Sequence, residues 1–270
     1  MMIEIPRQAR SVAIGAALQA ARIITDYYGR VFTIDAKLHN DFVTEVDRKS
    51  EEVIIQHILR AFPDHAILAE ETGKHRNESH FRWIIDPLDG TTNFIHGMPM
   101  FAVSIALEVH GQLAVGVVYE PLRKEMFVAE HGKGAFLNDR KIRVSATTEH
   151  SRCLLATGFP FKTFDFIDDY LNIFKTFMTQ TAGIRRPGSA ALDLCYLACG
   201  RFDGFWELNL NPWDIAAGTL IIQEAGGRIT GFDGQNNFLY KGHVIGSNGI
   251  LHDWMLSNVQ KSLGEKISLL

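Results

Sequence analysis

The stretch Trp83-Ile84-Ile85-Asp86-Pro87-Leu88-Asp89-Gly90-Thr91-Thr92-Asn93-Phe94 carries the most information in this 270-residue chain. Its apolar start predicts a short strand that delivers Asp86 to its carboxyl end. Pro87 has no backbone donor and therefore forbids a simple continuation of the strand. Asp89 follows three residues later, close enough to share a cation with Asp86. The segment therefore predicts a pair of carboxylates at the end of a strand.

The same stretch continues into a candidate anion site. Gly90 and Thr91 begin a turn into a helix, and backbone N–H groups at such a turn can cradle a phosphate. Two carboxylates and an anion cradle within six residues suit a phosphate bridged by a metal ion. The alternative is a strand-to-helix turn in which aspartate acts only as a cap.

Two further acidic segments favour the metal interpretation. Glu70 and Glu71 follow the apolar run Ile67–Ala69, and strand alternation lets only one of the two point into a shared site. Asp214 lies at the start of a predicted helix in Asn211–Gly218, where it is either an N-cap or a carboxylate aimed beyond the helix end. Magnesium prefers such oxygen ligands and usually takes a few carboxylates together with a substrate phosphate.

The first half of the chain combines helices with an antiparallel meander. Helices are predicted over 7–28 and 44–61, the second beginning with a capping-box pattern at Thr44–Asp47. Short apolar runs predict strands at Ile67–Ala69 and Trp83–Ile85. Three β-rich runs separated by turn residues predict the meander: Ala102–Val109, Leu113–Tyr119 and Glu125–Ala129.

The second half alternates helices and short strands. Helices are predicted near 166–179, 190–199, 213–225 and 250–263, and strands at 154–156, 204–207, 227–230 and 244–245. No flexible linker marks the boundary near 140–150. We therefore expect residues 1–270 to form a single catalytic unit: 1–145 as an α plus antiparallel-sheet half with the metal motifs, and 146–270 as an α/β half that completes the site.

Composition narrows the class of protein. The formal net charge is −4, which argues against a dedicated nucleic-acid module, since such proteins are usually basic. Three cysteines, an odd number, and an amphipathic start instead of a signal peptide point to a reducing compartment. No run approaches 18 apolar residues, so no membrane span is predicted. A soluble cytoplasmic protein is the expectation.

These motifs resemble the signature of the inositol monophosphatase family, in the same order and spacing across almost the whole chain. The segments that carry the resemblance are Asp41–Asp47, Glu70-Glu71, Asp86–Phe94 and Pro212–Gly218. The segment Gly188–Asp193 is most similar to bacterial members of the extragenic-suppressor type. The resemblance implies an α+β fold, the layered αβαβα sandwich of the inositol monophosphatase and sugar bisphosphatase type, and commonly a homodimer.

The resemblance also implies roles for individual residues. The implied ligands of up to three magnesium ions are Glu70, Asp86, the Leu88 carbonyl, Asp89 and Asp214. The implied catalytic residues are Asp47, Glu70 and Thr91, with Asp47 and the Thr91 hydroxyl orienting the attacking water. The implied substrate-binding residues are Leu88, Asp89, Gly90, Thr91, Arg185, Gly188, Ser189, Ala190, Glu207 and Asp214. The loop lysine that the family carries before Asp41 corresponds to Lys37.

The function implied is magnesium-dependent, lithium-sensitive hydrolysis of a small polyol or sugar phosphate monoester, with inositol 1-phosphate as the leading candidate. Relatives of this architecture hydrolyse fructose 1,6-bisphosphate or 3′-phosphoadenosine phosphates, and the shared metal core does not distinguish them. An alternative of another class is a regulatory protein that binds the transcription machinery, a role associated with some bacterial relatives. The pair Arg185-Arg186 can contribute to such a surface or to a dimer interface.

Overall fold

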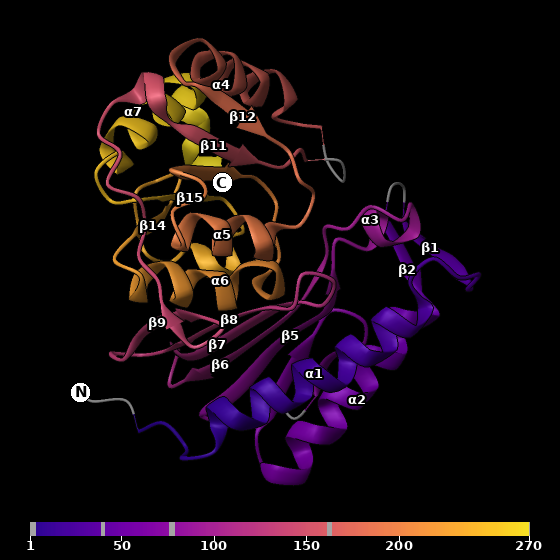
Figure 1. Cartoon of the computed structure of the whole chain (residues 1–270). Coiled ribbons are helices and arrows are strands. Elements are labelled where there is room, and N and C mark those ends of the chain that lie inside the picture. Colours follow the sequence, from indigo (N-terminus) through magenta and orange to yellow (C-terminus); the bar gives the residue numbers. More distant parts are fainter. Residues whose placement is uncertain (1–3, 39–40, 76–78, 161–163, 270) are drawn as a thin grey trace.

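The computed structural model describes residues 4–38, 41–75, 79–160 and 164–269, which stack into five layers (Figure 1). Two β-sheets alternate with three helix pairs. In order across the molecule, the pairs are α1 (Ala9–Tyr27) with α2 (Glu45–Ala61), α5 (Ala190–Ala198) with α6 (Pro212–Glu224), and α4 (Ile167–Gln180) with α7 (His252–Leu263). The predicted αβαβα sandwich of the α+β class is confirmed.

The first sheet has eight strands in the order β10-β9-β8-β7-β6-β5-β3-β4. Only β3 and β5 run parallel among these neighbours, and the rest of the sheet is antiparallel. Its strands are β3 (Ala66–Ala69), β4 (Gly73–His75), β5 (Phe81–Asp89), β6 (Ala102–Val109), β7 (Gln112–Glu120), β8 (Glu125–Glu130), β9 (Gly134–Leu137) and β10 (Arg140–Lys141). The meander expected from the sequence is β6 to β8.

The second sheet has five strands in the order β12-β11-β13-β15-β14. The β11 strand runs parallel to both neighbours, and β15 runs antiparallel to both of its own. The strands are β11 (Leu154–Thr157), β12 (Gly183–Arg185), β13 (Gly204–Glu207), β14 (Arg228–Gly231) and β15 (Val244–Ser247). Three 3-10 turns lie at His150–Arg152, Phe238–Tyr240 and Gly264–Leu269.

Three apolar clusters hold the layers together. One lies between α1, α2 and the eight-stranded sheet, one surrounds α5 and α6 between the sheets, and one lies under α4 and α7. Every residue of β6 is buried, because helices cover both faces of its sheet. At Gly116 of β7 an added Cβ would lie 2.8 Å from the Ala217 carbonyl oxygen, so α6 can approach the sheet closely there. This close packing fixes the start of α6 relative to the sheet.

The helices on the outer face follow from local sequence. Buried alanines recur along α1 at helical spacing, so α1 packs closely against α2 and the sheet. The α2 helix begins with the predicted capping box: the Thr44 side chain accepts from the backbone of Asp47, and the Asp47 carboxylate accepts from the Thr44 backbone.

Several short elements differ from the sequence expectation. The hairpin of β1 (Ile34–Leu38) and β2 (Asp41–Thr44) was not predicted, because its strands are short and mix apolar with polar residues, and Ile34 and Phe42 are exposed. Lys37 lies in β1, and its side chain is outside the described residues. The short strands β4, β9, β10 and β12 were also missed.

Strand β5 does not end at Asp86, as the sequence suggested. Its pairing with β6 resumes at Asp89 opposite Ala102, after an irregularity between Asp86 and Asp89. Pro87 lies within this irregularity, where its missing N–H disturbs no regular ladder bond. Both aspartates therefore belong to one strand.

No helix in the described part of the chain has the length and apolar character needed to cross a membrane.

Candidate active site

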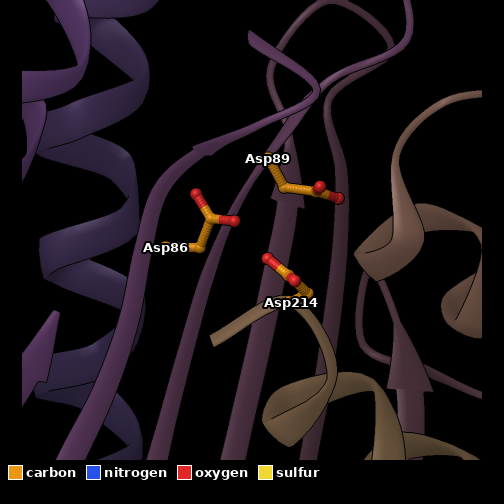
Figure 2. Close-up of side chains that lie close together, drawn as sticks. All are labelled: Asp86, Asp89 and Asp214. Carbon is orange, nitrogen blue, oxygen red and sulfur yellow. The ribbon is translucent and has the colours of Figure 1, made fainter. Parts of the chain in front are cut away.

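The acidic residues from distant parts of the chain meet beyond the end of β5. Asp86 and Asp89 come from β5, and Asp214 comes from the first turn of α6 (Figure 2). One carboxylate oxygen from each of the three lies within 4.8 Å of the others. Asp86 and Asp89 are buried and Asp214 is half-buried. Three carboxylates that converge in this way form a candidate site for a metal ion.

Each of these three carboxylates is held by hydrogen bonds from the chain. Asp86 accepts one from the Leu88 amide at 2.9 Å. Asp214 accepts one from the Asn211 amide at 2.6 Å, as part of the capping box of α6. The positions of both are therefore fixed by backbone that lies within three residues of them.

Asp89 is held instead by the second half of the chain. Its carboxylate accepts a hydrogen bond from the Ser189 hydroxyl and one from the Ala191 amide at 2.8 Å. Ser189 is the N-cap of α5, where it also accepts from the Leu192 amide. The start of α5 is thus joined directly to the end of β5.

Burial and neighbouring negative charges raise the pKa of Asp86 and Asp89. Burial raises the pKa of Asp86 well above its usual range, and Glu70, Asp89 and Asp214 raise it further. Burial also raises the pKa of Asp89 to about 6, although hydrogen bonds from Ser189 and Ala191 oppose the shift. A cation would stabilise the charged forms of these groups. A hard divalent ion such as magnesium fits this donor set, because every side-chain donor is a carboxylate oxygen.

Glu70 lies beside the three aspartates without being a member of that group in the described part of the chain. It follows β3 directly, and its amide donates to the Ile85 carbonyl of β5 at 3.2 Å. Its charge raises the pKa of Asp86 and Asp89, so its carboxylate is within electrostatic reach of both.

Asp47 and Thr91 are far apart in sequence and in contact in the structure. The Thr91 hydroxyl lies 3.0 Å from Asp47 Oδ1 and 3.0 Å from the Leu88 carbonyl oxygen. Asp47 is fully buried, and its other oxygen accepts from the Thr44 amide at 2.8 Å and the Thr44 hydroxyl at 2.5 Å. The capping box of α2 therefore also fixes the acceptor that faces Thr91.

Gly90 makes the turn between β5 and the short helix α3 (Thr91–Ile95). Its φ is +93°, in the left-handed region that favours glycine, and an added Cβ would lie 2.8 Å from the Met100 carbonyl oxygen. Any residue with a side chain would therefore be strained at Gly90.

The loop before α5 forms the opposite wall. The Asn93 amide group donates to the Met100 carbonyl at 2.8 Å and the Pro187 carbonyl at 2.9 Å, so it joins α3 to this loop. Gly188, with φ +91°, follows Pro187 and precedes Ser189 and the buried Ala190. The predicted residues Gly188, Ser189 and Ala190 thus lie next to Asp89.

Glu207 ends β13, with its side chain against Gly158, where an added Cβ would overlap its carboxylate. Burial raises the pKa of Glu207 to about 8. The nearby charges of Asp214 and Asp89 act in the same direction, and Arg186 opposes them. Glu207 is therefore within electrostatic reach of the three-aspartate group.

Arg185 is the predicted residue that the structure does not bring to this group. Its guanidinium is exposed and donates to the Ile184 carbonyl at 3.1 Å. The neighbouring Arg186 lies closer: an added Cβ at Gly188 would be 2.7 Å from its guanidinium, and its charge acts on Glu207. Successive residues of extended chain point to opposite sides, which separates the two arginines.

Sequence reasoning assigned no role to three residues that the structure places around the site. Asn93 joins the two walls, and Asp193 is a buried acid near Glu207 and Asp89. Glu51 accepts from the amides that follow Glu70. Glu51 could have been found from its spacing, because it lies four residues after Asp47 and therefore on the same helix face.

Nearly the whole chain is similar to known proteins. The model of the inositol monophosphatase family matches residues 6–263. The putative Nus factor SuhB of Neisseria meningitidis serogroup B is 48% identical over 241 residues, which are 88% of this chain and 92% of that protein.

Solved structures agree with the sequence matches. The extragenic suppressor protein SuhB from Bartonella henselae has a TM-score of 0.90 and 43% identity, covering 93% of this chain and 98% of that one. The inositol monophosphatase from Anabaena has a TM-score of 0.84 and 40% identity, covering 93% and 95%. The residues that carry the resemblance are those whose geometry is described above, and the chain belongs to the inositol monophosphatase family.

Proposed function

We propose that this protein is a magnesium-dependent phosphatase that hydrolyses a small polyol or sugar phosphate monoester, with inositol 1-phosphate as the first candidate. The convergence of Asp86, Asp89 and Asp214 carries the proposal. Three carboxylates this close repel one another, and a divalent cation together with a substrate phosphate would balance their charge.

The residues proposed to hold the metal ions are Glu70, Asp86, the Leu88 carbonyl, Asp89 and Asp214. When bound, the metal supplies charge neutralisation of the phosphate and lowers the pKa of water. The fixed positions of Asp86 and Asp214, each held by a nearby amide, reduce the reorganisation that binding requires. Backbone groups of Gly90 and Thr91 are proposed to hold the phosphate.

Asp47 and Thr91 are proposed to orient the water that attacks phosphorus. Asp47 accepts a hydrogen bond from the Thr91 hydroxyl at 3.0 Å, which leaves the lone pairs of that oxygen free to accept from the water. The attack is direct, so the water's oxygen forms the new bond to phosphorus while the bond to the alcohol oxygen breaks, and the proton that the water gives up balances the one that the alcohol oxygen takes up. No residue is required to become phosphorylated.

Glu207, Asp89, Ala190 and Asp214 are proposed to face the hydroxyl groups of the substrate, with Gly188 and Ser189 shaping the same wall. Carboxylates accept hydrogen bonds from hydroxyls, which favours a polyol over an apolar alcohol as the leaving group. Arg185 was expected to approach the substrate from a neighbouring region. Because its side chain is exposed, such an approach would require a partner subunit or a rearrangement of this segment.

Phosphate release from a panel of monoesters tests this function. We expect turnover of inositol 1-phosphate that a chelator abolishes and magnesium restores, and a higher kcat/KM than for 3′-phosphoadenosine phosphate or fructose 1,6-bisphosphate. Full activity in excess chelator would refute the metal mechanism. A clear preference for one of the other two substrates would instead reassign the substrate class.

We propose three further properties on the basis of the family membership. Lithium should inhibit by competing for a magnesium site, which a dose series in the same assay measures. A homodimer should be seen by light scattering, and a monomer at micromolar concentration would contradict it. A reducing cytoplasmic location agrees with the three cysteines, all of which are free.

A second candidate function is binding to the transcription machinery. The relatives named Nus factor SuhB, at up to 48% identity, favour it. The exposed Arg185 and Arg186 offer a basic surface for such a partner. Pull-down of RNA polymerase and its elongation factors with the wild-type protein should recover a complex, and the Arg185→Ala variant should weaken it. Recovery of no component above a bead control would contradict this function.

A further inference from the structure

One face of α2 is polar and yet buried. Asp47, Ser50 and Glu51 lie on adjacent turns of the helix and are each at most 1% exposed. A carboxylate is almost never buried in this way unless it is paired or hydrogen-bonded, because removing it from water is costly. The partners of Glu51 therefore indicate what this face of the helix does.

Glu51 uses both of its carboxylate oxygens on two successive backbone amides. Oε2 accepts from the Glu71 amide at 2.8 Å, and Oε1 accepts from the Thr72 amide at 2.8 Å. Hydrogen bonds to a charged acceptor are stronger than those between neutral groups. The two bonds thus hold the chain directly after Glu70 against α2.

The backbone amide of Glu70 itself is held as well. The Glu70 amide donates to the Ile85 carbonyl of β5, the strand that ends in the aspartates. Glu70 is therefore fixed on one side by the sheet and on the other by Glu51. Three residues after Glu70, β4 begins at Gly73 with φ +72°, so the loop between β3 and β4 is short.

The same helix also holds the turn from β5 into α3. Asp47, one turn before Glu51, accepts from the Thr91 hydroxyl, which lies 3.0 Å from the Leu88 carbonyl. The two bonded acids of α2 thus reach the loop that carries Glu70 and the start of α3, whose Thr91 hydroxyl contacts the Leu88 carbonyl of β5. A rigid helix that contacts both segments can set the distance between them.

We propose that Glu51 is a positioning residue for metal binding, which sets the place of Glu70 relative to Asp86, Asp89 and Asp214. It touches neither the metal nor the substrate and acts through the Glu71 and Thr72 amides. The inference rests on the proposed function, since it assigns to Glu51 a share of the magnesium affinity of the same site.

Direct magnesium binding to the substrate-free protein tests this role. Isothermal titration calorimetry with magnesium chloride would compare the wild type with Glu51→Gln, which keeps the shape but leaves an amide N–H facing a backbone N–H. We expect Kd for magnesium to rise by about 10- to 100-fold, as for other partners that orient a metal ligand. At saturating magnesium, kcat should return to near the wild-type value and KM for substrate should change little.

Two matched variants separate positioning from general destabilisation. Glu52→Gln makes the same chemical change one residue along, on the exposed face of α2, and should leave Kd unchanged. Glu108→Gln removes a buried carboxylate that Arg82 and Tyr240 hold away from the site, so it should lower the melting temperature without changing Kd.

The outcomes distinguish this inference from the proposed function. If the wild type binds magnesium and folded Glu51→Gln binds it equally well, Glu51 is only structural and the inference is wrong. If the wild type itself binds no magnesium, the proposed function fails first and this inference fails with it. Should Glu51→Gln not fold, Glu51→Asp decides: its shorter side chain keeps the charge but cannot reach both amides, so Kd should still rise.

Discussion

The carboxylates on the two sides of the site are held differently. On the metal side, Asp47, Asp86 and Asp89 each accept at least one hydrogen bond of 3.0 Å or less from neighbouring backbone or side chains. On the side where Glu207 is proposed to face the substrate hydroxyls, the neighbouring acid Asp193 is buried, and its Oδ1 has no hydrogen-bond partner among the described residues. The carboxylates on the metal side are thus oriented by the protein without a ligand, whereas the hydroxyl side contains a buried acceptor without a hydrogen-bond partner among the described residues.

This difference indicates that the two sides have different roles in the reaction. Groups that are already oriented need no rearrangement during the reaction, which is the property required of residues that stabilise a transition state. A buried acceptor without a partner costs about 1–3 kcal/mol, and a substrate hydroxyl would recover that free energy on binding. We therefore expect substitutions on the metal side to act on kcat and those on the hydroxyl side to act on KM.

The largest effect is expected from removing a member of the three-aspartate group. Asp214→Asn keeps the shape of the α6 cap but removes one charge, so kcat/KM should fall on the order of 10³-fold, because several kcal/mol of charge stabilisation are lost. Phosphate release under saturating magnesium measures it. The control is Asp253→Asn, an exposed partner of Arg228 far from the site, which should behave as wild type. Activity within tenfold of wild type in Asp214→Asn would remove it from the metal site.

A smaller effect on kcat is expected from substituting the residues that are proposed to orient the water. Asp47→Asn can still cap α2 but is a weaker acceptor for the Thr91 hydroxyl, so kcat should fall about 10²-fold with little change in KM. Thr91→Ala should lose a similar amount. Because the two act as one unit, the double variant should lose less than the product of the two losses. Normal kcat in a folded Asp47→Asn protein would mean that Asp47 is only a helix cap.

On the hydroxyl side, Glu207→Gln should raise KM for inositol 1-phosphate by about tenfold, which corresponds to the loss of one hydrogen bond. The kcat of this variant should change less, since Glu207 is not part of the Asp47–Thr91 pair that is proposed to orient the water. A simple alkyl phosphate without further hydroxyls serves as the matched control substrate, and its KM should be unaffected. Equal effects on both substrates would show that Glu207 acts on the phosphate side after all.

The smallest effect is on stability. In chelated protein the pKa of Glu207 is raised by burial from 4.5 to about 8. Between these values the folded state holds a proton that the unfolded state has lost, so the stability contributed by the protonated form declines as pH rises toward 8. Glu207→Gln lacks this proton, so its stability relative to wild type should increase from pH 5 to pH 8. Urea unfolding at several pH values measures it, and parallel profiles for the two proteins would contradict the shift.

Much of the secondary structure could be predicted from local pattern. The helix predicted over 44–61 is Glu45–Ala61 with the expected cap at Thr44, and the three meander strands occur at the predicted places. The β1–β2 hairpin was missed because its strands bury little apolar surface. The end of β5 was misplaced because a proline can lie within a strand where the ladder is irregular.

The sequence by itself determined the segments that carry the chemistry: the three-residue spacing of Asp86 and Asp89, the glycine turn after them and the capping box around Asp47. Each depends on backbone within a few residues, so the pattern is visible in the chain. The tertiary structure alone decided that Ser189 and the Ala191 amide hold Asp89, that Arg186 and not Arg185 lies near Glu207, and that Glu51 holds the chain after Glu70. Those contacts join residues distant in sequence, and the packing of α2 and of the α5–α6 pair on opposite faces of one sheet brings them together.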